Sequence, residues 1–534
     1  MRKEETDYSL YLVTDSGMVP AESTFESQVE QAILNGASIV QLREKRQLTL
    51  EFVHRAQNLL YLTRKSGIPL IINDRLDIAL AVNADGVHLG QDDMPASVVR
   101  AHLGPDKIIG VTCSTVEEVK QVCEEGIADY VGLGTAYKTS TKKDVTFTEG
   151  LGPFGMKKML AQLKKHNQTR EKKIKCVVIG GVNHSNVQNL LYHSAVRGQN
   201  FDGVAVVSCI MASKRAGNAT SELLGKIKSL PAWTHSYTLE RKGCCPQKQK
   251  VAAMMDSSPL MHHITNNVVK NFSANVSLAI GGSPIMSEFD EEFEELVSNI
   301  PNISLVLNLG TPAQGQMEIF KSAILVYNRF GRHIVFDPVA CGATNARLRC
   351  CLELLSTGHM SVMKGNFGEI LSIWKSIVCR NDGVAQAPTM RGVDSVSESS
   401  DSEILTIGKQ VALELRNIVV ITGKVNYIFD GIERGSQLYD INTSEDDVIV
   451  EKIAGGHELM GSITGTGCSL GSTIAAFLAS KADGYKNNQF DLFQAVVGAV
   501  TLYNDAGSLA GRETATPGTF VNKFLDALYT LTHQ

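Results

Sequence analysis

The chain has 534 residues, of which 43% are hydrophobic and 20% are charged, and its formal net charge is −5. This length is too great for a single hydrophobic core and predicts roughly two to four domains. The acidic balance offers no basic surface for nucleic acid, and no stretch reaches the roughly 18 uninterrupted apolar residues that a membrane helix needs. The N-terminus shows no signal-peptide core. We therefore expect a soluble, cytoplasmic protein that binds neither nucleic acid nor membrane.

The 11 cysteines are scattered, with adjacent pairs at Cys244-Cys245 and Cys350-Cys351 and no C-x-x-C motif. This pattern indicates neither a zinc ribbon nor a disulfide framework. Most of the cysteines are expected to be small, reduced core residues.

The first 208 residues contain eight short apolar stretches that alternate with segments of helical spacing. Eight strands alternating with helices over about 200 to 250 residues predict a (β/α)₈ TIM barrel. Helical spacing is clearest at 25–34, 50–63, 116–125 and 187–194, and weakest at 77–82. The predicted strands are Leu10–Val13, Ser38–Leu42, Leu70–Ile72, Gly86–Leu89, Ile108–Val111, Tyr130–Leu133, Cys176–Ile179 and Gly203–Val207.

Polar residues follow successive predicted strands, at the ends that meet at one mouth of such a barrel. Basic side chains with paired carboxylates suit a pyrophosphate bound with Mg²⁺, which takes one or two carboxylates and phosphate oxygens. Any single charge could equally be a solvated loop residue, and any single aspartate could be a helix cap, but their joint placement favours a site. The residues are Gln41, Arg43 and Lys45 after the second strand, Asn73 and Asp74 after the third, and His88, Gln91, Asp92 and Asp93 at the fourth.

Two later stretches indicate a second anion site at the same mouth. The loop 135–144 adds hydroxyl groups and cations. The seventh strand ends in Gly180-Gly181 and the eighth in Val207-Ser208, where barrels commonly bind a phosphate through backbone N–H groups. A tight turn would explain the glycine pair alone equally well. Two anion sites imply two phosphorylated substrates.

These motifs, in this order, resemble those of thiamine phosphate synthases over nearly all of residues 8–228. The resemblance implies that a pyrimidinylmethyl pyrophosphate (HMP-PP) is joined to a thiazole phosphate, with loss of pyrophosphate. It places Mg²⁺ on Asp74 and Asp93, and the thiazole phosphate on Gly181, Val207 and Ser208. Thr112 stands where the family commonly carries serine, and the hydroxyl is retained. The residues implied to hold HMP-PP are Gln41, Arg43, Lys45, Asn73, Thr112, Thr139, Thr141 and Lys142.

A polar and basic stretch with Pro and Gly, Arg241 to Lys250, separates the two halves. A basic stretch of this kind could be an interaction tail, but a solvated linker is the more common explanation. We therefore predict a first domain at 1–232, a linker at 233–256 and a second domain at 257–534.

The second half alternates apolar strands with amphipathic helices and predicts an open, doubly wound α/β sheet. Its ligands should lie beyond the carboxyl ends of the strands, where Asp337, Lys364 and Thr422 fall. The serine-rich segment within 380–403 is predicted to be a disordered surface insertion. The predicted strands are Leu305–Leu309, Ile334–Phe336, Val362–Met363, Val419–Ile421 and Tyr427–Phe429.

A glycine-rich stretch, Gly461 to Cys468, precedes an apolar helix-forming segment. Gly465 and Gly467 permit positive φ, and the helix start would present unpaired N–H groups to an anion. A cysteine at a helix N-terminus can have a lowered pKa, so Cys468 is a candidate base or nucleophile. A plain glycine turn before a helix is an equally good explanation of this stretch alone.

An anion hole, a candidate base, Asp337 and the Lys364-Asn366-Glu369 group indicate phosphoryl transfer to a hydroxyl. No P-loop motif occurs. Residues 264–269, 282–286, 337–339, 364–369, 421–423 and 465–468 resemble the motifs of hydroxyethylthiazole kinases, which have the ribokinase-like fold. Ala340-Cys341 departs from the Gly-Ala that is more usual in that family. The resemblance runs from about Ser258 to Thr532.

This resemblance implies that Asn266, Met286 and Gly465 contact a thiazole alcohol, that Lys364 and Thr422 contact ATP, and that Cys468 lies beside the reacting hydroxyl. From the residues alone, Asn266 could be a helix cap and Met286 a core residue. A thiol of ordinary pKa, about 8.5, must be tuned downward to serve as a base at pH 7.

Both halves together are similar to the fungal bifunctional thiamine-biosynthesis enzymes. The resemblance implies small-molecule substrates, Mg²⁺ as cofactor, ATP as co-substrate, and a homo-oligomer, either a trimer or a hexamer. Two alternatives stay open at this point. One is a working barrel fused to a non-catalytic kinase relic that only assembles the oligomer, and the other is a kinase for a different heterocyclic alcohol.

Overall fold

The computed structural model describes residues 3–139, 141, 146–237, 244–379, 390–391, 394–395, 400–434, 439–481 and 490–533. The chain forms two compact units. The first comprises Met1–Leu230 with Gln437–Ile441, and the second comprises Pro231–Ser436 with Asn442–Gln534.

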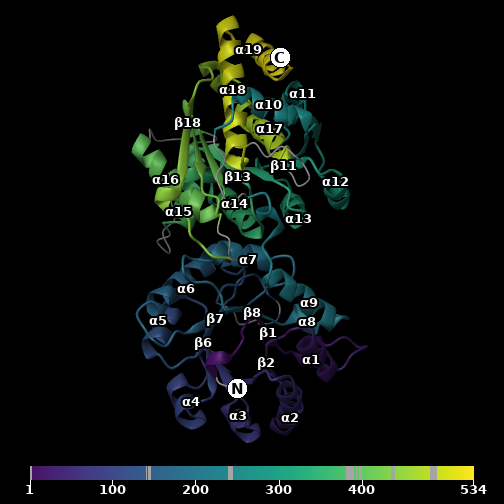
Figure 1. Cartoon of the computed structure of the whole chain (residues 1–534), viewed down its shortest axis with the longest axis vertical. Coiled ribbons are helices and arrows are strands. Elements are labelled where there is room, and N and C mark those ends of the chain that lie inside the picture. The colour runs from purple at the N-terminus through teal and green to yellow at the C-terminus, as the bar shows by residue number, and fades with distance from the viewer. Residues whose placement is uncertain are drawn as a thin grey trace. The chain divides into compact units, whose positions relative to one another are not determined.

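The first unit is a closed barrel of eight parallel strands in chain order, as predicted (Figure 1). Pairing of β1 with both β2 and β8 closes the sheet. The strand boundaries agree with the predicted ones to within about two residues, because each strand is a short apolar stretch buried on both faces. The strands are β1 Leu10–Val13, β2 Ile39–Leu42, β3 Leu70–Asn73, β4 Gly86–Leu89, β5 Ile108–Cys113, β6 Tyr130–Leu133, β7 Lys175–Val178 and β8 Gly203–Val206.

The barrel helices begin and end where the sequence supplies caps. The side chain of Thr24 accepts a hydrogen bond from Ser27 N at the start of α1, and that of Thr115 accepts one from Glu118 N at the start of α5. Gly67 ends α2 in the left-handed region at φ 70°. The helices are α1 Phe25–Leu34, α2 Thr49–Ser66, α3 Leu76–Val82, α4 Ala96–Leu103, α5 Val116–Glu125, α6 Gly152–Asn167, α7 Val187–Ser194, α8 Ser208–Met211 and α9 Ala216–Ile227.

The second unit is an eight-stranded sheet in the order β10-β9-β11-β12-β13-β16-β17-β18. The strands from β10 to β16 are parallel, and β17 and β18 add an antiparallel edge. The open α/β sheet is therefore confirmed. The strands are β9 Leu260–Ile264, β10 Ser283–Ile285, β11 Ile303–Asn308, β12 Ile334–Asp337, β13 Val362–Asn366, β16 Ile418–Thr422, β17 Val425–Asp430 and β18 Ile449–Ala454.

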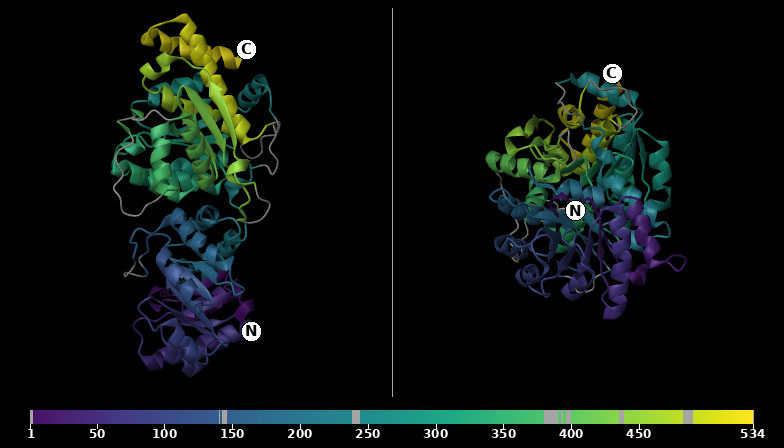
Figure 2. Two further views of the ribbon diagram at one scale, coloured as in Figure 1. Left: turned by 90° about the vertical axis from the view of Figure 1, so that its left-hand side faces the viewer. Right: turned by 60° about the horizontal axis from the view of Figure 1, so that its bottom comes forward.

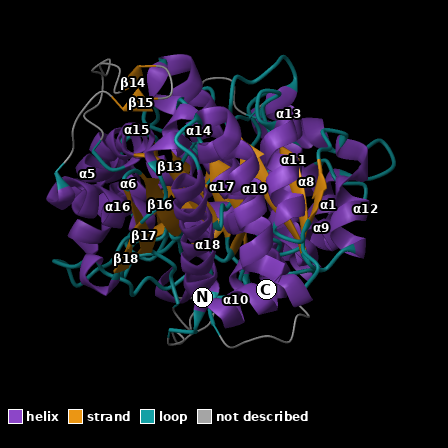
Figure 3. Cartoon of the chain, turned by 90° about the horizontal axis from the view of Figure 1, so that it is seen from above, coloured by secondary structure: helices purple, strands orange, loops and turns teal. Residues whose placement is uncertain are grey.

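Helices flank this sheet (Figure 3). The apolar helix α17 packs on β9, β11 and β12, and α18 and α19 lie side by side beyond it, yellow in Figure 2. One continuous core joins strand residues such as Val306 and Val335 to these helices. The helices are α10 Gln247–Asp256, α11 Lys270–Ala279, α12 Phe293–Asn299, α13 Gln316–Arg329, α14 Asn345–Thr357, α15 Phe367–Ile377, α16 Asp401–Leu415, α17 Thr466–Ala479, α18 Leu492–Glu513 and α19 Pro517–His533.

The predicted linker, residues 233–256, falls within the second unit. Residues 247–256 form α10, and Val251, Ala253 and Met254 are buried in the core of that unit. The lysines and glutamines at the start of this segment concealed the helix, because they made the whole stretch look solvated. Trp233 also belongs to this unit, where its ring stacks on that of His359 at 5.6 Å.

The predicted disordered insertion is described only in part. Residues 380–389, 392–393 and 396–399 lie outside the described residues. Within the insertion, β14 (Met390–Arg391) pairs antiparallel with β15 (Asp394–Ser395). The helix α16 begins at Asp401, inside the predicted insertion 380–403, because Ser400 caps it by accepting from Glu403 N.

Candidate active sites

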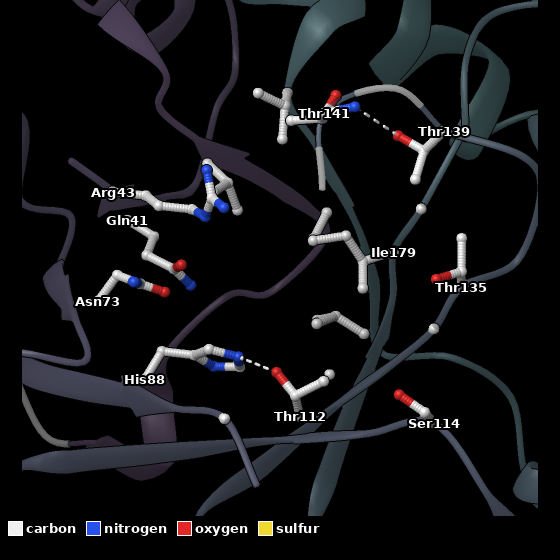
Figure 4. Close-up of a pocket in the computed structure, with 18 of the residues that line it drawn as sticks. Gln41, Arg43, Asn73, His88, Thr112, Ser114, Thr135, Thr139, Thr141 and Ile179 are labelled. Carbon is white, nitrogen blue, oxygen red and sulfur yellow. Dashed lines mark hydrogen bonds between the residues drawn. The ribbon is translucent and has the colours of Figure 1, made fainter. Parts of the chain in front are cut away.

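A cavity of about 410 Å³ opens at the carboxyl ends of the barrel strands (Figure 4). The site residues predicted from the first half meet there, although they come from seven different strand ends. Lys142 lies outside the described residues. The predicted residues that line the cavity are Gln41, Arg43, Lys45, Asn73, Asp74, Asp93, Thr112, Thr139, Thr141, Gly181, Val207 and Ser208.

Two cations stand at this cavity after β2. The backbone N–H of Arg43 donates to Thr14 Oγ1 at 3.1 Å, and its guanidinium lies 3.9 Å from Asp15 Oδ2. Lys45 forms an ion pair with Asp74 and is half exposed. Both side chains can therefore exchange their present partners for the oxygens of an anion.

The carboxyl groups of Asp74 and Asp93 lie next to one another in the lining of the cavity. Asp74 has φ 61°, a left-handed conformation that aspartate tolerates better than most residues. Gly90 N donates to Asp93 Oδ2 at 2.7 Å. Burial raises the pKa of Asp93, and a hydrogen bond to Asp74 raises it further. The two carboxyl groups repel one another when both are ionised, and the ammonium group of Lys45 offsets the charge of only one of them. Such a pair fits a divalent cation.

A line of hydrogen bonds crosses the floor of the cavity inside the barrel. Gln41 Nε2 donates to Tyr11 OH at 2.9 Å, and that oxygen lies 2.7 Å from Tyr130 OH. The ring of His88 continues the line, with Nδ1 2.8 Å from Tyr130 OH and Nε2 2.8 Å from Thr112 Oγ1. Tyr11 and Tyr130 were not predicted as site residues, because both stand in apolar strands where tyrosine is typical of core packing.

The backbone after β7 leaves no room for side chains. Gly180 and Gly181 have φ values of 99° and 66°. A Cβ on Gly181 would lie 2.6 Å from the carbonyl oxygen of Lys138, so only glycine fits. Ser208 begins the short helix α8 nearby, and backbone N–H groups are thus available to a phosphate.

The second unit has a cavity of about 800 Å³ at the carboxyl ends of its parallel strands. Of the residues predicted for this half, Asn266, Lys364, Thr422, Gly465 and Cys468 line it. Met286 is not among the described lining residues. It follows the edge strand β10 and is half-buried.

A buried ion pair forms part of the lining of this cavity. Lys364 Nζ is 3.1 Å from Asp337 Oδ2, and the two side chains are only 4% and 1% exposed. Asn308 Nδ2 donates to the same carboxylate at 3.0 Å, and Asn266 Nδ2 donates to Asn308 Oδ1 at 3.0 Å. Burial raises the pKa of Asp337, and Lys364 opposes that shift. Asn308 was missed because it ends an apolar strand and stands in no polar cluster.

Glu369 is held against the same pair by backbone donors. Its carboxylate accepts from Ala340 N at 2.7 Å and from Asn366 N at 2.8 Å, and Asn366 in turn caps α15 by accepting from Glu369 N. Burial, followed by the neighbouring Asp337, raises the pKa of Glu369 to about 7. Glu369 thus fixes both the loop after β12 and the start of α15.

The expectation that Cys468 has a lowered pKa is wrong for this structure. Cys468 is the third residue of α17, and its burial, followed by the nearby carboxylate of Asp337, raises the pKa of the thiol to about 12. These effects outweigh the helix N-terminus. Gly465 is the N-cap with φ 92°, whereas Gly467 lies inside the helix and is not among the glycines with positive φ. The backbone N–H groups available to an anion are therefore those at the start of α17, beyond Gly465.

Comparisons with known proteins agree with both cavities. Residues 251–534 match the model of the hydroxyethylthiazole kinase family, and residues 10–210 match that of thiamine monophosphate synthase. The thiamine biosynthetic bifunctional enzyme of Saccharomyces cerevisiae is 40% identical over all of this chain and 97% of its own length. The chain belongs to the bifunctional thiamine biosynthetic enzymes.

Other relatives match the whole chain or one half of it. A probable bifunctional enzyme of this family from Schizosaccharomyces pombe is 38% identical over all of this chain and 96% of its own. The thiamine-phosphate synthase of Clostridium botulinum is 43% identical over 41% of this chain and 94% of its own. The first unit therefore contains the synthase domain and the second contains the kinase domain.

Two further findings concern metal binding and membrane insertion. Among the described residues, no group of three or more His, Cys, Asp or Glu side chains could by itself hold a metal ion. The carboxylate pair of the synthase domain would thus need substrate oxygens to complete a metal site. None of the described helices combines the length and the apolar composition needed to cross a bilayer.

Proposed function

We propose that the kinase domain transfers the γ-phosphoryl group of ATP to 4-methyl-5-(2-hydroxyethyl)thiazole, and that the synthase domain joins the resulting phosphate to HMP-PP. The products are thiamine phosphate and pyrophosphate. The observation that carries this proposal is the gathering, in each domain, of the predicted anion-binding residues around one cavity. The family of the chain names both reactions.

In the synthase domain, the leaving group and the nucleophile need different partners. As the carbon–oxygen bond to pyrophosphate breaks, Arg43 and Lys45 neutralise the charge that develops on the leaving oxygens. Mg²⁺, held by Asp74 and Asp93, would supply further neutralisation. Gln41, Asn73 and Thr112 hold the pyrimidine, with Thr139 and Thr141 beside the pyrophosphate. Gly181, Val207 and Ser208 hold the thiazole phosphate, so that the ring nitrogen can attack in line.

In the kinase domain, Asn266, Met286 and Gly465 bind the thiazole alcohol, and Lys364 and Thr422 bind ATP. The start of α17 presents backbone N–H groups to the transferred phosphoryl group. With the thiol pKa raised to about 12, Cys468 is protonated at neutral pH, and the Asp337 carboxylate lies near it. We propose that Cys468 orients the substrate hydroxyl, and that the hydroxyl proton passes to an oxygen of the transferred phosphoryl group as the new phosphorus–oxygen bond forms and the bond to ADP breaks.

The test is to give the full chain ATP, Mg²⁺, the thiazole alcohol and HMP-PP, and to look for thiamine phosphate by mass. Release of ADP that depends on the thiazole alcohol, without HMP-PP, distinguishes an active kinase from a relic. Coupling of supplied thiazole phosphate without such ADP release would support the relic. A panel of other heterocyclic alcohols tests whether another substrate is preferred.

The Cys468→Ala variant tests the role of the thiol. We expect turnover of the kinase to fall by about 10-fold or more, with the KM for the thiazole alcohol changed by less than about 3-fold, because the lost contact acts on the reacting hydroxyl. Cys350→Ala, at a half-buried cysteine that does not line the cavity, is the control. An unchanged turnover in Cys468→Ala would remove the thiol from the mechanism.

We also propose a homo-oligomer, a trimer or a hexamer. Large apolar side chains close to the kinase cavity are exposed, including Val268 at 71% and Phe289 at 56%. Exposed apolar residues of this size are often covered by another subunit. Light scattering of the full chain gives the mass directly, and a monomer would contradict the proposal.

A further inference from the structure

The line of hydrogen bonds beneath the synthase cavity has a direction. Gln41 Nε2 carries only hydrogens, so Tyr11 OH must accept at that end. Tyr11 is 1% exposed and Tyr130 is fully buried. A buried hydroxyl that accepts on both sides would leave its own hydrogen unused, which carries a desolvation penalty. Tyr11 OH therefore donates to Tyr130.

The same reasoning extends the direction to the far end of the line. Because Tyr130 OH accepts from Tyr11, its own hydrogen goes to His88 Nδ1, 2.8 Å away. The remaining hydrogen of the neutral ring then stands on Nε2 and is donated to Thr112 Oγ1. Thr112, which lines the cavity, is left with its own hydroxyl hydrogen to give to a ligand.

We propose that Tyr11, Tyr130 and His88 are positioning residues that transmit the amide orientation of Gln41 to Thr112, and so fix Thr112 as a hydrogen-bond donor in the pyrimidine site. The side chains of all five residues form one continuous path from β1, β2, β4, β5 and β6. Tyr11 and His88 also line the cavity, whereas Tyr130 is not among its described lining residues, so Tyr130 is the member that acts only through its neighbours.

A fixed donor at Thr112 suits the chemistry of an aminopyrimidine. Such a ring offers nitrogen acceptors next to an exocyclic amino donor, so a site that reads it needs a donor and an acceptor in defined places. Thr112 supplies the donor. At the other end of the line, the side-chain amide oxygen Oε1 of Gln41 supplies an acceptor. This reading of the ligand rests on the proposed function, whereas the direction of the hydrogen bonds does not.

Reversing the first member of the line tests the direction without any substrate. Glu at position 41 can only accept when ionised, so Tyr11 would donate to it, Tyr130 to Tyr11, and His88 Nδ1–H to Tyr130. Solid-state ¹⁵N NMR of the full chain labelled at histidine reports which ring nitrogen carries hydrogen, and the spectrum of His88→Gln identifies the resonances of His88. We expect hydrogen on Nε2 alone in the wild type at about pH 8 and on Nδ1 in Gln41→Glu.

A cut in the line distinguishes transmission from a direct electrostatic effect. In a Tyr130→Phe background, Gln41→Glu should leave the protonation of His88 as it is in Tyr130→Phe alone. In a Tyr8→Phe background the full change should persist, because Tyr8 packs 5.1 Å from the Tyr130 ring but its hydroxyl is not in the line. A wild-type ring with hydrogen on Nδ1, or a change that survives Tyr130→Phe, would overturn the proposal.

Kinetics then test the consequence for the ligand. Tyr130→Phe should raise the KM for HMP-PP about 10-fold and change kcat by less than about 3-fold, whereas Tyr8→Phe should change neither by more than about 2-fold. If the full chain makes no thiamine phosphate, the proposed function fails but the NMR result still decides the direction of the line. An unchanged KM in Tyr130→Phe, together with the expected NMR result, would overturn the effect on binding and leave the path a structural feature.

Discussion

The two cavities of this chain handle charge in opposite ways. In the synthase domain, the cations face an open cavity, with Lys45 52% and Arg43 17% exposed, and the buried floor consists of neutral hydrogen-bonding groups. In the kinase domain, a lysine and a carboxylate are themselves buried and hold one another. Removing one partner of a buried ion pair destabilises the fold, because the other charge is left buried and uncompensated. Substitutions should therefore separate function from stability in the first cavity and damage both in the second.

The largest effect is expected from Lys364→Met, which removes the cation between Asp337 and Glu369. The uncompensated carboxylates should destabilise the kinase domain by about 3 to 5 kcal/mol, and kinase activity should fall by more than about 10³-fold. The chain has two tryptophans, Trp233 and Trp374, and both belong to this unit, so their fluorescence in urea reports its unfolding. Coupling of supplied thiazole phosphate should persist under conditions where the variant remains folded.

The control for that variant is Lys523→Met on α19. Lys523 is 40% exposed in an ion pair with Glu513, and a surface pair of this kind contributes little to stability. If Lys364→Met unfolded at the same urea concentration as Lys523→Met, the buried pair would not have the structural role given to it here.

In the synthase domain, Arg43→Ala should impair activity and leave stability nearly unchanged. Coupling should fall by about 10²- to 10³-fold because one cation no longer faces the leaving pyrophosphate, while kinase activity is unchanged. The side chain lines an open cavity and holds only a long ion pair, 3.9 Å from Asp15 Oδ2, so the free energy of unfolding should change by less than about 1 kcal/mol. Arg46→Ala, three residues further on and exposed, is the matched control. Normal coupling in Arg43→Ala would mean that the pyrophosphate binds elsewhere.

The pKa of Glu369 predicts how the stability of the kinase domain depends on pH. The pKa rises from 4.5 to about 7 on folding, so the folded state binds more protons than the unfolded state between these values. Glu369 should therefore make its full contribution to stability below about pH 4.5, and this contribution should decline by about 3 kcal/mol as the pH rises to about 7. Glu369→Gln should flatten this decline in the tryptophan-monitored transition.

A matched substitution on the surface provides the comparison for Glu369→Gln. Glu294→Gln alters a carboxylate that is 63% exposed, and it should leave the dependence on pH as it is in the wild type. An equal decline with pH in Glu369→Gln would show that another group is responsible.

The sequence predicted the barrel closely because its strands are short apolar stretches and its polar residues follow them at once. Charged residues in or just after an apolar strand, such as Arg43 and Lys364, stand out in such a pattern. Tyr11, Tyr130 and Asn308 did not, because they are neutral residues of apolar strands, where a polar atom on a buried side chain cannot be told from core packing. The raised pKa of Cys468 was equally hidden, since it depends on burial and on a carboxylate far earlier in the chain.

The edge strands of the kinase sheet escaped prediction for a related reason. The strand β18 has exposed and half-exposed residues along most of its length, and β10 contains a proline, so neither shows the apolar stretch of a central strand. Pairing with a neighbouring strand, which the local sequence does not encode, makes them strands. The helix α10 likewise depends on burial against a distant part of the chain.

The smallest expected effect is that of substitutions at Thr112, a neutral residue of the synthase cavity. These substitutions test most directly how the two cavities differ. Thr112→Ser keeps the hydroxyl that accepts from His88 Nε2 and removes one methyl group, so coupling should change by less than about 3-fold. Thr112→Val keeps the shape and removes the hydroxyl, and it should raise the KM for HMP-PP by about 10-fold, the effect of one hydrogen bond. Steady-state kinetics of both variants decide the point. Equal KM values for Thr112→Ser and Thr112→Val would show that the synthase cavity recognises its ligand by shape and charge alone. The neutral hydrogen-bonding groups of its floor would then have no part in recognition.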